Sequence, residues 1–472
     1  MGQKIIVDPV TRIEGHLKIE VEVDGGKVVN AHTSGTLFRG MELIMQNRDP
    51  RDAQQIMQRI CGVCPIGHAT AGTLALDDAF GITPPPNGRI IRNLILGSNY
   101  IQSHILHFFH LAALDYVKGP DVPPFTPRYQ ADYRLPEAVN RQAVDLYLEA
   151  LHMRRKAHEM LAIWGGKMPH VQAIVPGGVT EIPDAQKIVD FKSRLAELID
   201  FIDNKYVPVV KVVADAYQDW LDIGRGCKNM LSYGVFPQEK DKFIPAGVYI
   251  NGQYGAFDYN KVTEQVKHSW YSDDISSNPN DAVVKPDPAK KDGYSWLKAP
   301  RYDGIVMEVG PLARMIVMKQ KDVIGLGEKA FSVMGRHFAR AVECSLVAHA
   351  MDEWVMQLEP GKPVCTPHEV PNQAQGVGLT EAARGALGHW HKIEGGRTKV
   401  YNAVVPTTWN AGPRDDKGQP GPMEQALIGA PVKDAKNPVE LVRIVRAFDP
   451  CFGCAIHLMT PDKKVIAQFV ID

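Results

Sequence analysis

The chain has 472 residues, of which 44% are hydrophobic and 23% are charged, and its formal net charge is −1. This composition is typical of a soluble globular protein with one large domain or a few ordinary ones, and the charge gives no general attraction to nucleic acid or anionic lipid. No run of about eighteen apolar residues indicates a transmembrane segment. The first residues, MGQKIIVDPV, carry neither a secretory pattern nor a twin-arginine signal, so we expect any export to depend on another protein.

The first part of the chain is predicted to contain strands followed by long helices. Residues 4–32 show strand patterns around a turn at Asp24-Gly25-Gly26, which is typical of antiparallel strands. A short helix is expected after Asp49-Pro50, where an N-cap and a proline would start it. Longer helical patterns, joined by proline- and glycine-rich connections, cover about 87–117, 136–164, 183–222 and 322–358.

The second part of the chain is more mixed. Residues 225–300 contain short strand patterns and a polar stretch rich in proline and aspartate. The residues Glu394-Gly395-Gly396 predict a hairpin turn before the strand KVYNAVVPTTW. A last short helix, VELVRIVRAF, is expected to begin at Asn437-Pro438.

The seven cysteines are too few for a disulfide scaffold in a chain of this length. Four of them form two CxxC pairs, Cys61 with Cys64 and Cys451 with Cys454. Each pair follows a short predicted helix that begins at an Asx-Pro pair and is broken at its end, an arrangement that would hold thiols in fixed directions, as a metal site requires. The other three cysteines are expected to be small buried hydrophobic residues: Cys227, Cys344 and Cys365.

Four converging thiolates can hold a soft or borderline metal ion. A structural zinc site uses the same ligands, but its two pairs usually lie roughly fifteen to twenty residues apart, whereas these pairs lie at opposite ends of the chain. Two separate redox disulfides are a further alternative, because a single CxxC is a weak signal. The cysteines alone therefore leave a shared redox-metal site, a zinc site and two redox disulfides open.

Further motifs surround the cysteines. Each pair is followed by a histidine, in RICGVCPIGH and in DPCFGCAIH, and the chain also contains RIEGH, FRGME and ARGAL. Together, and in this order, these motifs resemble the large subunit of nickel–iron hydrogenases over nearly the whole chain. The stretch YIQSHILHFFHLAALDYVKGPDV is most similar to the nickel–iron–selenium branch.

The resemblance implies an enzyme that reversibly cleaves H2 heterolytically to protons and electrons at a Ni–Fe centre. Cys61 and Cys451 would be terminal ligands of nickel, and Cys64 and Cys454 would bridge nickel and iron. Carbon monoxide and cyanide, made by other proteins, would complete the iron. Cys451 would act as the base and Glu14 as the first proton acceptor; without the resemblance, Glu14 would be an exposed carboxylate at a strand end.

Four more residues match positions around the metal pair. Arg384 would lie over its open face and contact one cyanide, and Thr407 would donate to the other. Asp449 would be the acidic residue of the same canopy, and His68 would donate to the bridging Cys64. Taken singly, these residues would be a surface arginine ion pair, a strand threonine, a helix-ending Asp-Pro and a packed histidine.

The resemblance also implies a gas path and a third metal. Val63 and Leu111 match positions that line the gas path, although both also fit an ordinary core. Glu42, the backbone carbonyl of Ala403 and His457 match a site for magnesium or iron. Three histidines spaced i, i+3 and i+6 are interpreted as buried packing or supporting groups: His104, His107 and His110.

The chain departs from the family pattern at three positions. Most members have aspartate at the position of Ser103 and proline at the position of Ala383. The selenium branch has selenocysteine where this chain reads Cys451, so the native residue there stays open, and with it the oxygen tolerance of the enzyme.

The resemblance further implies a single mature domain over residues 1–457 and an extension, 458–472, that a dedicated protease removes between His457 and Leu458 once nickel is in place. Without the resemblance, the segment KKVIAQFVI would be a terminal edge strand.

No further cysteine motif is available to hold iron–sulfur clusters, so a small subunit that carries them is required. Maturation and metal-insertion proteins and a redox carrier such as a cytochrome are expected partners. By analogy the enzyme is periplasmic, co-exported with the small subunit, with the cytoplasm as the alternative. The competing interpretations are a metal-free subunit like that of respiratory complex I, which has lost both CxxC pairs, and a zinc-stabilised scaffold.

The predicted elements and the resemblance together give the expected fold. It is a mainly helical α+β fold with a central bundle of long helices and peripheral antiparallel β-sheets. The metal pair is expected to be buried where the two ends of the chain meet.

Overall fold

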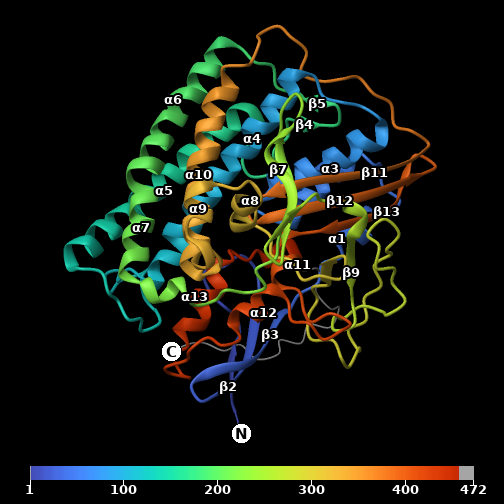
Figure 1. Ribbon diagram of the computed structural model, residues 1–472. Helices are drawn as coiled ribbons and strands as arrows, with labels where there is room; N and C mark the ends of the chain where they lie inside the picture. The colour runs from blue at the N-terminus through green and yellow to red at the C-terminus, as the bar shows by residue number, and fades with distance from the viewer. Residues whose placement is uncertain (1, 456–472) are drawn as a thin grey trace.

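Long helices form the core of the molecule. The computed structural model describes residues 2–455, and in it four long helices pack side by side: α4 (Pro86–Ile105), α5 (Glu137–Gly165), α6 (Ala185–Phe201) and α10 (Val333–Val355) (Figure 1). A π-helical turn at Leu106–Ala112 extends α4, and another at Ile202–Tyr206 joins α6 to α7 (Val207–Ala216). The first three long helices expected from the sequence are therefore confirmed.

The fourth expected helix is divided. A short α9 (Lys321–Ile324) and a 3-10 turn at Gly327–Phe331 precede α10. The side chain of Ser332 accepts a hydrogen bond from the backbone N–H of Gly335 at 3.0 Å and so caps a new helix start. This cap explains why the helical pattern of 322–358 does not form one continuous helix.

All pairings between the named strands that the structure describes are antiparallel. Two short ladders pair β4 (Ile174–Val175) with β5 (Gly178–Val179) and β9 (Val262–Gln265) with β10 (Ala299–Tyr302). Three larger sheets each contain three strands: β1 (Gln3–Val7), β2 (Leu17–Asp24) and β3 (Lys27–Gly35); β6 (Met230–Pro237), β7 (Lys242–Ile250) and β8 (Gln253–Gly255); and β11 (Gln373–Ala382), β12 (Gly385–Glu394) and β13 (Arg397–Val404).

Shorter helices connect the sheets to the bundle: α1 (Met41–Met45), α2 (Asp52–Met57), α3 (Pro65–Phe80), α8 (Pro311–Val317), α11 (Pro406–Ala411), α12 (Pro422–Leu427), α13 (Val439–Ala447) and α14 (Phe452–Ala455). The predicted strand KVYNAVVPTTW is too long, because proline cannot donate to a strand ladder and Pro406 instead begins α11. Asn437 does not cap α13, since its side chain bonds the backbone of Gln130.

The helix α3 lies directly against β11. A Cβ atom on Gly378 would come within 2.0 Å of the carbonyl oxygen of Ala71, so only glycine permits this approach of strand and helix. The helix begins directly after Cys64, and the strand ends two residues before Arg384. The close contact therefore fixes the position of one cysteine pair relative to the β11–β12 turn.

The two ends of the described chain meet. The backbone N–H of Phe452 donates to the carbonyl oxygen of Glu14 at 2.7 Å, and Glu14 forms a short parallel bridge with Cys451. The predicted α+β fold with a helical bundle and peripheral sheets is confirmed. No helix of residues 2–455 is both long and apolar enough to cross a membrane.

Candidate metal centre

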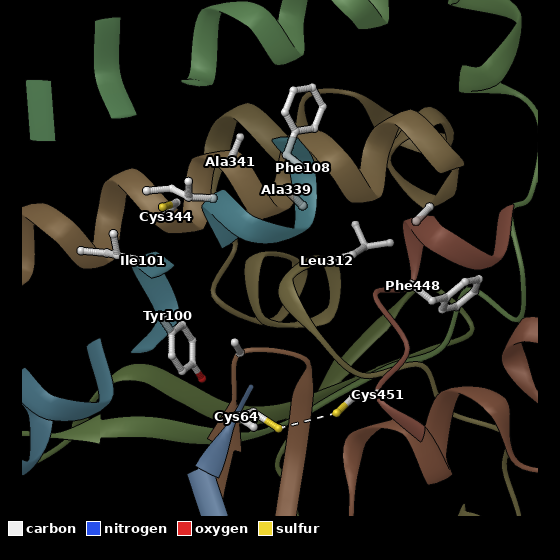
Figure 2. Packing of buried hydrophobic residues seen from close by; sticks show 14 of the residues in the cluster. Cys64, Tyr100, Ile101, Phe108, Leu312, Ala339, Ala341, Cys344, Phe448 and Cys451 are labelled. Carbon is white, nitrogen blue, oxygen red and sulfur yellow. Dashed lines mark hydrogen bonds between the residues drawn. The ribbon is translucent and has the colours of Figure 1, made fainter. Parts of the chain in front are cut away.

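Thiols from the two CxxC pairs gather into one buried cluster. The Sγ atoms of Cys61, Cys64 and Cys451 all lie within 4.8 Å of one another. The distance to Cys451 Sγ is 3.8 Å from Cys64 (Figure 2) and 3.2 Å from Cys61. These separations exceed a disulfide bond of about 2.0 Å, and all three residues are buried. Cysteines from both pairs therefore contribute to one site, whereas the side chain of Cys454 lies outside the described part of the chain.

The first pair sits between a broken helix and a new one. Cys61 is extended after the 3-10 turn Gln58–Ile60, and Cys64 is the N-cap of α3, with Pro65 at the first helical position. The backbone N–H groups of Val63 and Cys64 donate to Cys61 Sγ at 3.2 and 3.4 Å. Such hydrogen bonds and a helix N-terminus favour the thiolate forms that bind metal ions.

The second pair is presented by a turn that follows α13. Asp449 adopts a φ of 53°, which redirects the chain after the helix ends at Ala447. The backbone N–H of Cys451 then donates to Oγ1 of Thr407 at 2.9 Å. Thr407 therefore lies in α11 beside the thiol cluster and not in a strand.

Arg39 joins the two cysteine segments, and sequence reasoning missed it. Its guanidinium donates to the carbonyl oxygens of Arg59 at 3.2 Å and of Ile60, both just before Cys61, and to that of Gly453 at 2.5 Å, just after Cys451. The signal was present in FRGME, where only the glutamate was assigned a role.

Glu14 contacts the second cysteine segment directly. Its Oε2 accepts a hydrogen bond from the backbone N–H of Gly453 at 2.6 Å and lies 3.1 Å from Cys451 Sγ. Burial raises the pKa of the carboxyl, and the neighbouring Cys61 thiol raises it further, against the hydrogen bonds from Cys451 and Gly453. Glu14 is half-buried, so it is not an exposed strand-end carboxylate.

Arg384 is buried in the β11–β12 turn. Its guanidinium donates from Nη2 to Asp449 Oδ1 at 3.0 Å and from Nη1 to Ser103 Oγ at 3.3 Å. Burial alone would lower the pKa of the guanidinium, but Asp449 and the thiols of Cys451 and Cys64 hold it well above its usual value. With 3% of its surface exposed, Arg384 is not a surface ion pair.

Two polar atoms of this ion pair have no hydrogen-bond partner among residues 2–455. They are Nε of Arg384 and Oδ2 of Asp449, a donor and an acceptor, both buried. Buried polar atoms normally have partners. The pair therefore offers hydrogen bonding to a polar group at the thiol cluster.

His68 and Val63 lie close to Cys64 in the chain, whereas Leu111 lies in the π-helical turn that extends α4. His68 Nδ1 is 3.2 Å from His389 Nε2, and His389 Nδ1 is 2.7 Å from the hydroxyl of Tyr401. Val63 and Leu111 are both half-buried. Their backbone carbonyls accept hydrogen bonds, from Gln102 and Arg12 respectively, and the gas-path roles stay predictions.

The expected third-metal residues are described in part. Glu42 is buried in α1, which packs against the strand β13 that contains Ala403. The pKa of the nearby Tyr401 is raised by burial and, secondly, by Glu42, so the carboxylate lies close to this strand. His457 and the extension 458–472 lie outside the described residues, and the third site stays a prediction.

The three histidines at i, i+3 and i+6 do not converge, because each contacts a different acceptor: His104 with Glu343 at 2.9 Å, His107 with the carbonyl of Arg446 at 2.6 Å, and His110 with the carbonyl of Tyr147 at 3.1 Å. This agrees with their interpretation as packing or supporting groups.

The expectation for the lone cysteines holds only for Cys344, which is buried. Cys227 and Cys365 are half-buried in loops, where their thiols lie near the backbone carbonyls of Asn229 and Pro176. Their position in loops, not in a helix such as that of Cys344, explains the difference.

Comparisons with known proteins agree with this site. The nickel-dependent hydrogenase family matches residues 39–122 and 117–457, and a HoxL-like family matches residues 4–34. The chain is 48% identical to the periplasmic [NiFeSe] hydrogenase large subunit of Desulfomicrobium baculatum, over 97% of this chain and 95% of that protein. It is 34% identical to the hydrogenase-2 large chain of Escherichia coli (strain K12), over 99% of each.

Solved structures give the same result. The fold matches the Ni-Fe-Se hydrogenase from D. vulgaris Hildenborough in the as-isolated oxidized state with a TM-score of 0.95 and 48% identity, over 97% of this chain and 100% of that one. It matches the H2-activated [NiFeSe]-hydrogenase of Dm. baculatum with a TM-score of 0.94 and 49% identity, over 97% and 100% of the two chains.

A buried cluster of thiols from both ends of one chain, in this fold, defines the metal-binding subunit of a redox enzyme. The chain belongs to the nickel-dependent hydrogenase large-subunit family, whose members are hydrogen-cycling oxidoreductases. Its cysteine-rich site supports the binding of nickel and iron. The zinc-scaffold alternative has no support from these findings.

Proposed function

We propose that this chain is the catalytic subunit of a heterodimeric hydrogenase, with Cys61, Cys64, Cys451 and Cys454 holding a nickel–iron pair. The observation that carries the proposal is the 3.2 Å separation of the Cys61 and Cys451 sulfur atoms, which are 390 positions apart in the chain. When bound, the metal pair supplies a soft redox centre at which H2 is cleaved heterolytically and reversibly.

The donor set fits this group. Thiolates are the ligands that suit a redox-active soft metal, and the buried charge of Arg384 offsets part of their negative charge. Cys61 and Cys451 would be terminal ligands of nickel, and Cys64 and Cys454 would bridge the two metals.

The surroundings also suit polar diatomic ligands on iron, carbon monoxide and cyanide. The unpaired Nε of Arg384 is a buried donor on the side of the cluster where Asp449 and Ser103 hold the guanidinium. Thr407 accepts from Cys451 through its oxygen, and its hydroxyl hydrogen can still donate. Arg384 and Thr407 are the proposed donors to the cyanides.

Proton movement is assigned to two of the chain's own groups. A proton on Cys451 Sγ has Glu14 Oε2 within 3.1 Å, which is suitable for direct transfer. The hydrogen bond from Gly453 holds that oxygen in place. Glu14 is therefore the proposed first proton acceptor.

The remaining family positions are proposed in the same way. His68, tethered through His389 to Tyr401, supports the bridging Cys64. Val63 and Leu111 line the gas path. Glu42, the carbonyl of Ala403 and His457 hold magnesium or iron, a proposal supported by the packing of α1 on β13.

Electrons released from H2 require a partner. The three cysteines outside the CxxC pairs lie far apart in the chain, so we assign the iron–sulfur clusters to a small subunit. A redox carrier such as a cytochrome would accept the electrons from that subunit. The relative from Desulfomicrobium baculatum is named periplasmic, which supports a periplasmic location reached together with the small subunit; the cytoplasm is the alternative.

Maturation would end with removal of residues 458–472 by a dedicated protease, after insertion proteins have delivered the metals. The family match ends at residue 457, which supports cleavage between His457 and Leu458. Mass spectrometry of active enzyme should find His457 at the C-terminus, and active enzyme that retains Asp472 would refute this step. The same mass shows whether residue 451 is cysteine or selenocysteine.

The decisive test is metal analysis and infrared spectroscopy of the purified heterodimer. Nickel and iron in near-equal amounts, infrared bands of bound cyanide and carbon monoxide, and H2-dependent dye reduction are expected. Zinc alone, without these bands, would support a scaffold instead.

A further inference from the structure

Arg314 in α8 uses all the N–H groups of its guanidinium in hydrogen bonds to residues near Arg384. It is fully buried, and its five N–H groups meet five acceptors. Nε and Nη2 donate to the two carboxylate oxygens of Glu343 at 2.5 and 2.7 Å, and Nη1 donates to Glu381 Oε2 at 2.7 Å. The last two bonds reach the backbone carbonyls of Ala382 at 3.0 Å and Ala383 at 2.7 Å.

Those two carbonyls belong to the residues immediately before Arg384. We propose that Arg314 is a positioning residue for hydrogen turnover: by holding the carbonyls of Ala382 and Ala383, it fixes the turn from which Arg384 extends over the thiol cluster. This inference rests on the proposed function of the cluster.

The turn is held from both sides. Arg314 binds the backbone carbonyls of the turn. On the other side, Asp449 and Ser103 accept hydrogen bonds from the Arg384 side chain. A Cβ atom on Gly310 would come within 2.9 Å of the Arg384 carbonyl oxygen, so α8 begins directly against the turn. Small movements of α8 would therefore move Arg384.

The carboxylates that bind Arg314 are themselves fixed by other elements. Glu343 in α10 lies 2.9 Å from His104 of α4, and Glu381 Oε1 accepts from the backbone N–H of Tyr233 in β6 at 2.7 Å. The hydroxyl of Tyr100, also in α4 and labelled in Figure 2, donates to the backbone carbonyl of Glu381 at 2.9 Å. Hydrogen bonds of this network thus connect the turn before Arg384 to helices α4 and α10 of the bundle.

Stability alone does not explain such a network. Burying charges costs free energy, and well-packed apolar side chains are often equally stable or better. A planar guanidinium with all its donors used instead gives a fixed geometry. Residue 383 is alanine and not proline, so its own φ is not restricted and the turn depends more on contacts such as those of Arg314. We therefore assign the network to the placement of Arg384.

The test compares two buried arginines in the assembled enzyme, Arg314→Lys and Arg301→Lys. Arg301 is a matched control: it is fully buried and donates to Asp415 and to the backbone carbonyls of Pro300 and Gln419, none of them next to a CxxC cysteine or Arg384. Lysine keeps the charge at both sites but loses the fork of donors.

For Arg314→Lys we expect wild-type nickel and iron contents, shifted or broadened infrared bands of bound cyanide, and a fall in kcat of roughly 10²-fold with little change in KM, the effect of misplacing a group by about 1 Å. Arg301→Lys should lose a similar amount of thermal stability but keep the wild-type bands and kcat. Wild-type bands and kcat in Arg314→Lys, or equal changes in both variants, would overturn the inference.

The experiment also distinguishes a failure of the proposed function from a failure of the Arg314→Lys variant to assemble. Wild-type enzyme without cyanide bands would contradict the proposed function itself, independently of Arg314. If Arg314→Lys does not assemble, Glu381→Gln, which keeps the side-chain shape but removes the charge paired with Nη1, decides: shifted bands are expected, and unshifted bands with normal kcat would overturn the inference.

Discussion

Glu14 and Gly453 are joined by a hydrogen bond of 2.6 Å from the backbone N–H to Oε2, and the same oxygen lies 3.1 Å from Cys451 Sγ. One carboxylate oxygen therefore contacts both the thiol and the turn that holds it. A residue in this position can act as a proton acceptor and as a structural attachment, and substitutions can separate the two roles.

Replacing Glu14 by glutamine should remove proton transfer and keep the attachment. A glutamine oxygen still accepts from Gly453, but the amide does not take a proton at neutral pH. We expect hydrogen turnover to fall by roughly 10²- to 10⁴-fold, with nickel content unchanged, as measured by H2-dependent dye reduction and metal analysis. Glu22→Gln, on the exposed side of β2, should keep wild-type turnover. Rapid turnover in Glu14→Gln would show that protons leave by another group.

Gly15 determines how closely the two ends of the chain approach each other. Its φ is +81°, and a Cβ atom there would lie 2.5 Å from the backbone nitrogen of Gly453. Gly15→Ala should therefore push the Cys451 segment away from Cys61 and lower the nickel content of the purified protein.

The matched control is Gly26→Ala, which separates this clash from backbone strain. Gly26 has a similar φ of +76°, but nothing lies within 4 Å of its Cβ position. Both variants should lose about 1 kcal/mol of stability from the left-handed conformation, while Gly26→Ala keeps its nickel. Equal nickel contents in the two variants would contradict this role of Gly15.

Local sequence patterns predicted most of the helices and strands but not all of their boundaries. Hydrophobic periodicity located three of the long helices, and Gly395-Gly396 located the β12–β13 turn. The boundaries failed where a single side chain decides: Ser332 starts α10 anew, and Pro406 ends β13. Each of these boundaries depends on one hydrogen bond that is made or missing, the cap of Ser332 or the absent N–H of Pro406. Hydrophobic periodicity does not reveal either.

The site was predicted where its residues lie in motifs that resemble the family, namely the two CxxC segments and short motifs such as RIEGH and ARGAL. The burial of Arg384 and its pairing with Asp449 follow from the fold, because 65 positions separate them. Arg39 was missed because its acceptors are backbone carbonyls of two distant segments. Arg314 was missed because the carboxylates of Glu343 and Glu381 and the two carbonyls that it binds come together only in the fold. Charged residues inside apolar helices, such as Arg314 in PLARMIV, were the available signal.

Thr407 offers a test of the support under Cys451. Thr407→Val has nearly the same shape but leaves the buried N–H of Cys451 without its acceptor at 2.9 Å, which costs about 1–3 kcal/mol. We expect a lower melting temperature and shifted cyanide bands in the assembled enzyme. Thr407→Ser keeps the hydroxyl and should restore both; a valine variant that matches the serine variant would contradict the role of this hydrogen bond.

Glu424 in α12 makes stability depend on pH away from the metal centre. Its Oε1 accepts from the backbone N–H of Thr33 at 3.0 Å and from the hydroxyl of Tyr294 at 2.9 Å, while its buried Oε2 has no partner among residues 2–455. Burial raises the pKa of Glu424 to about 7, against the opposing hydrogen bonds from Thr33 and Tyr294. The carboxyl therefore stays protonated in the folded chain at pH values where it is already ionised in the unfolded chain.

The sign of the effect follows from this difference in bound protons. As pH rises from the ordinary glutamate pKa to about 7, the folded chain keeps a proton that the unfolded chain has lost, so the free energy of unfolding falls, by about 3 kcal/mol in total. Glu424→Gln should melt close to wild type near pH 5 and above it at pH 8, in calorimetry of the assembled enzyme. Glu239→Gln, at an exposed position, should follow wild type at both pH values. A Glu424→Gln variant with the wild-type pH dependence would mean that the carboxyl is already ionised in the fold, which would require a cation or donor at Oε2.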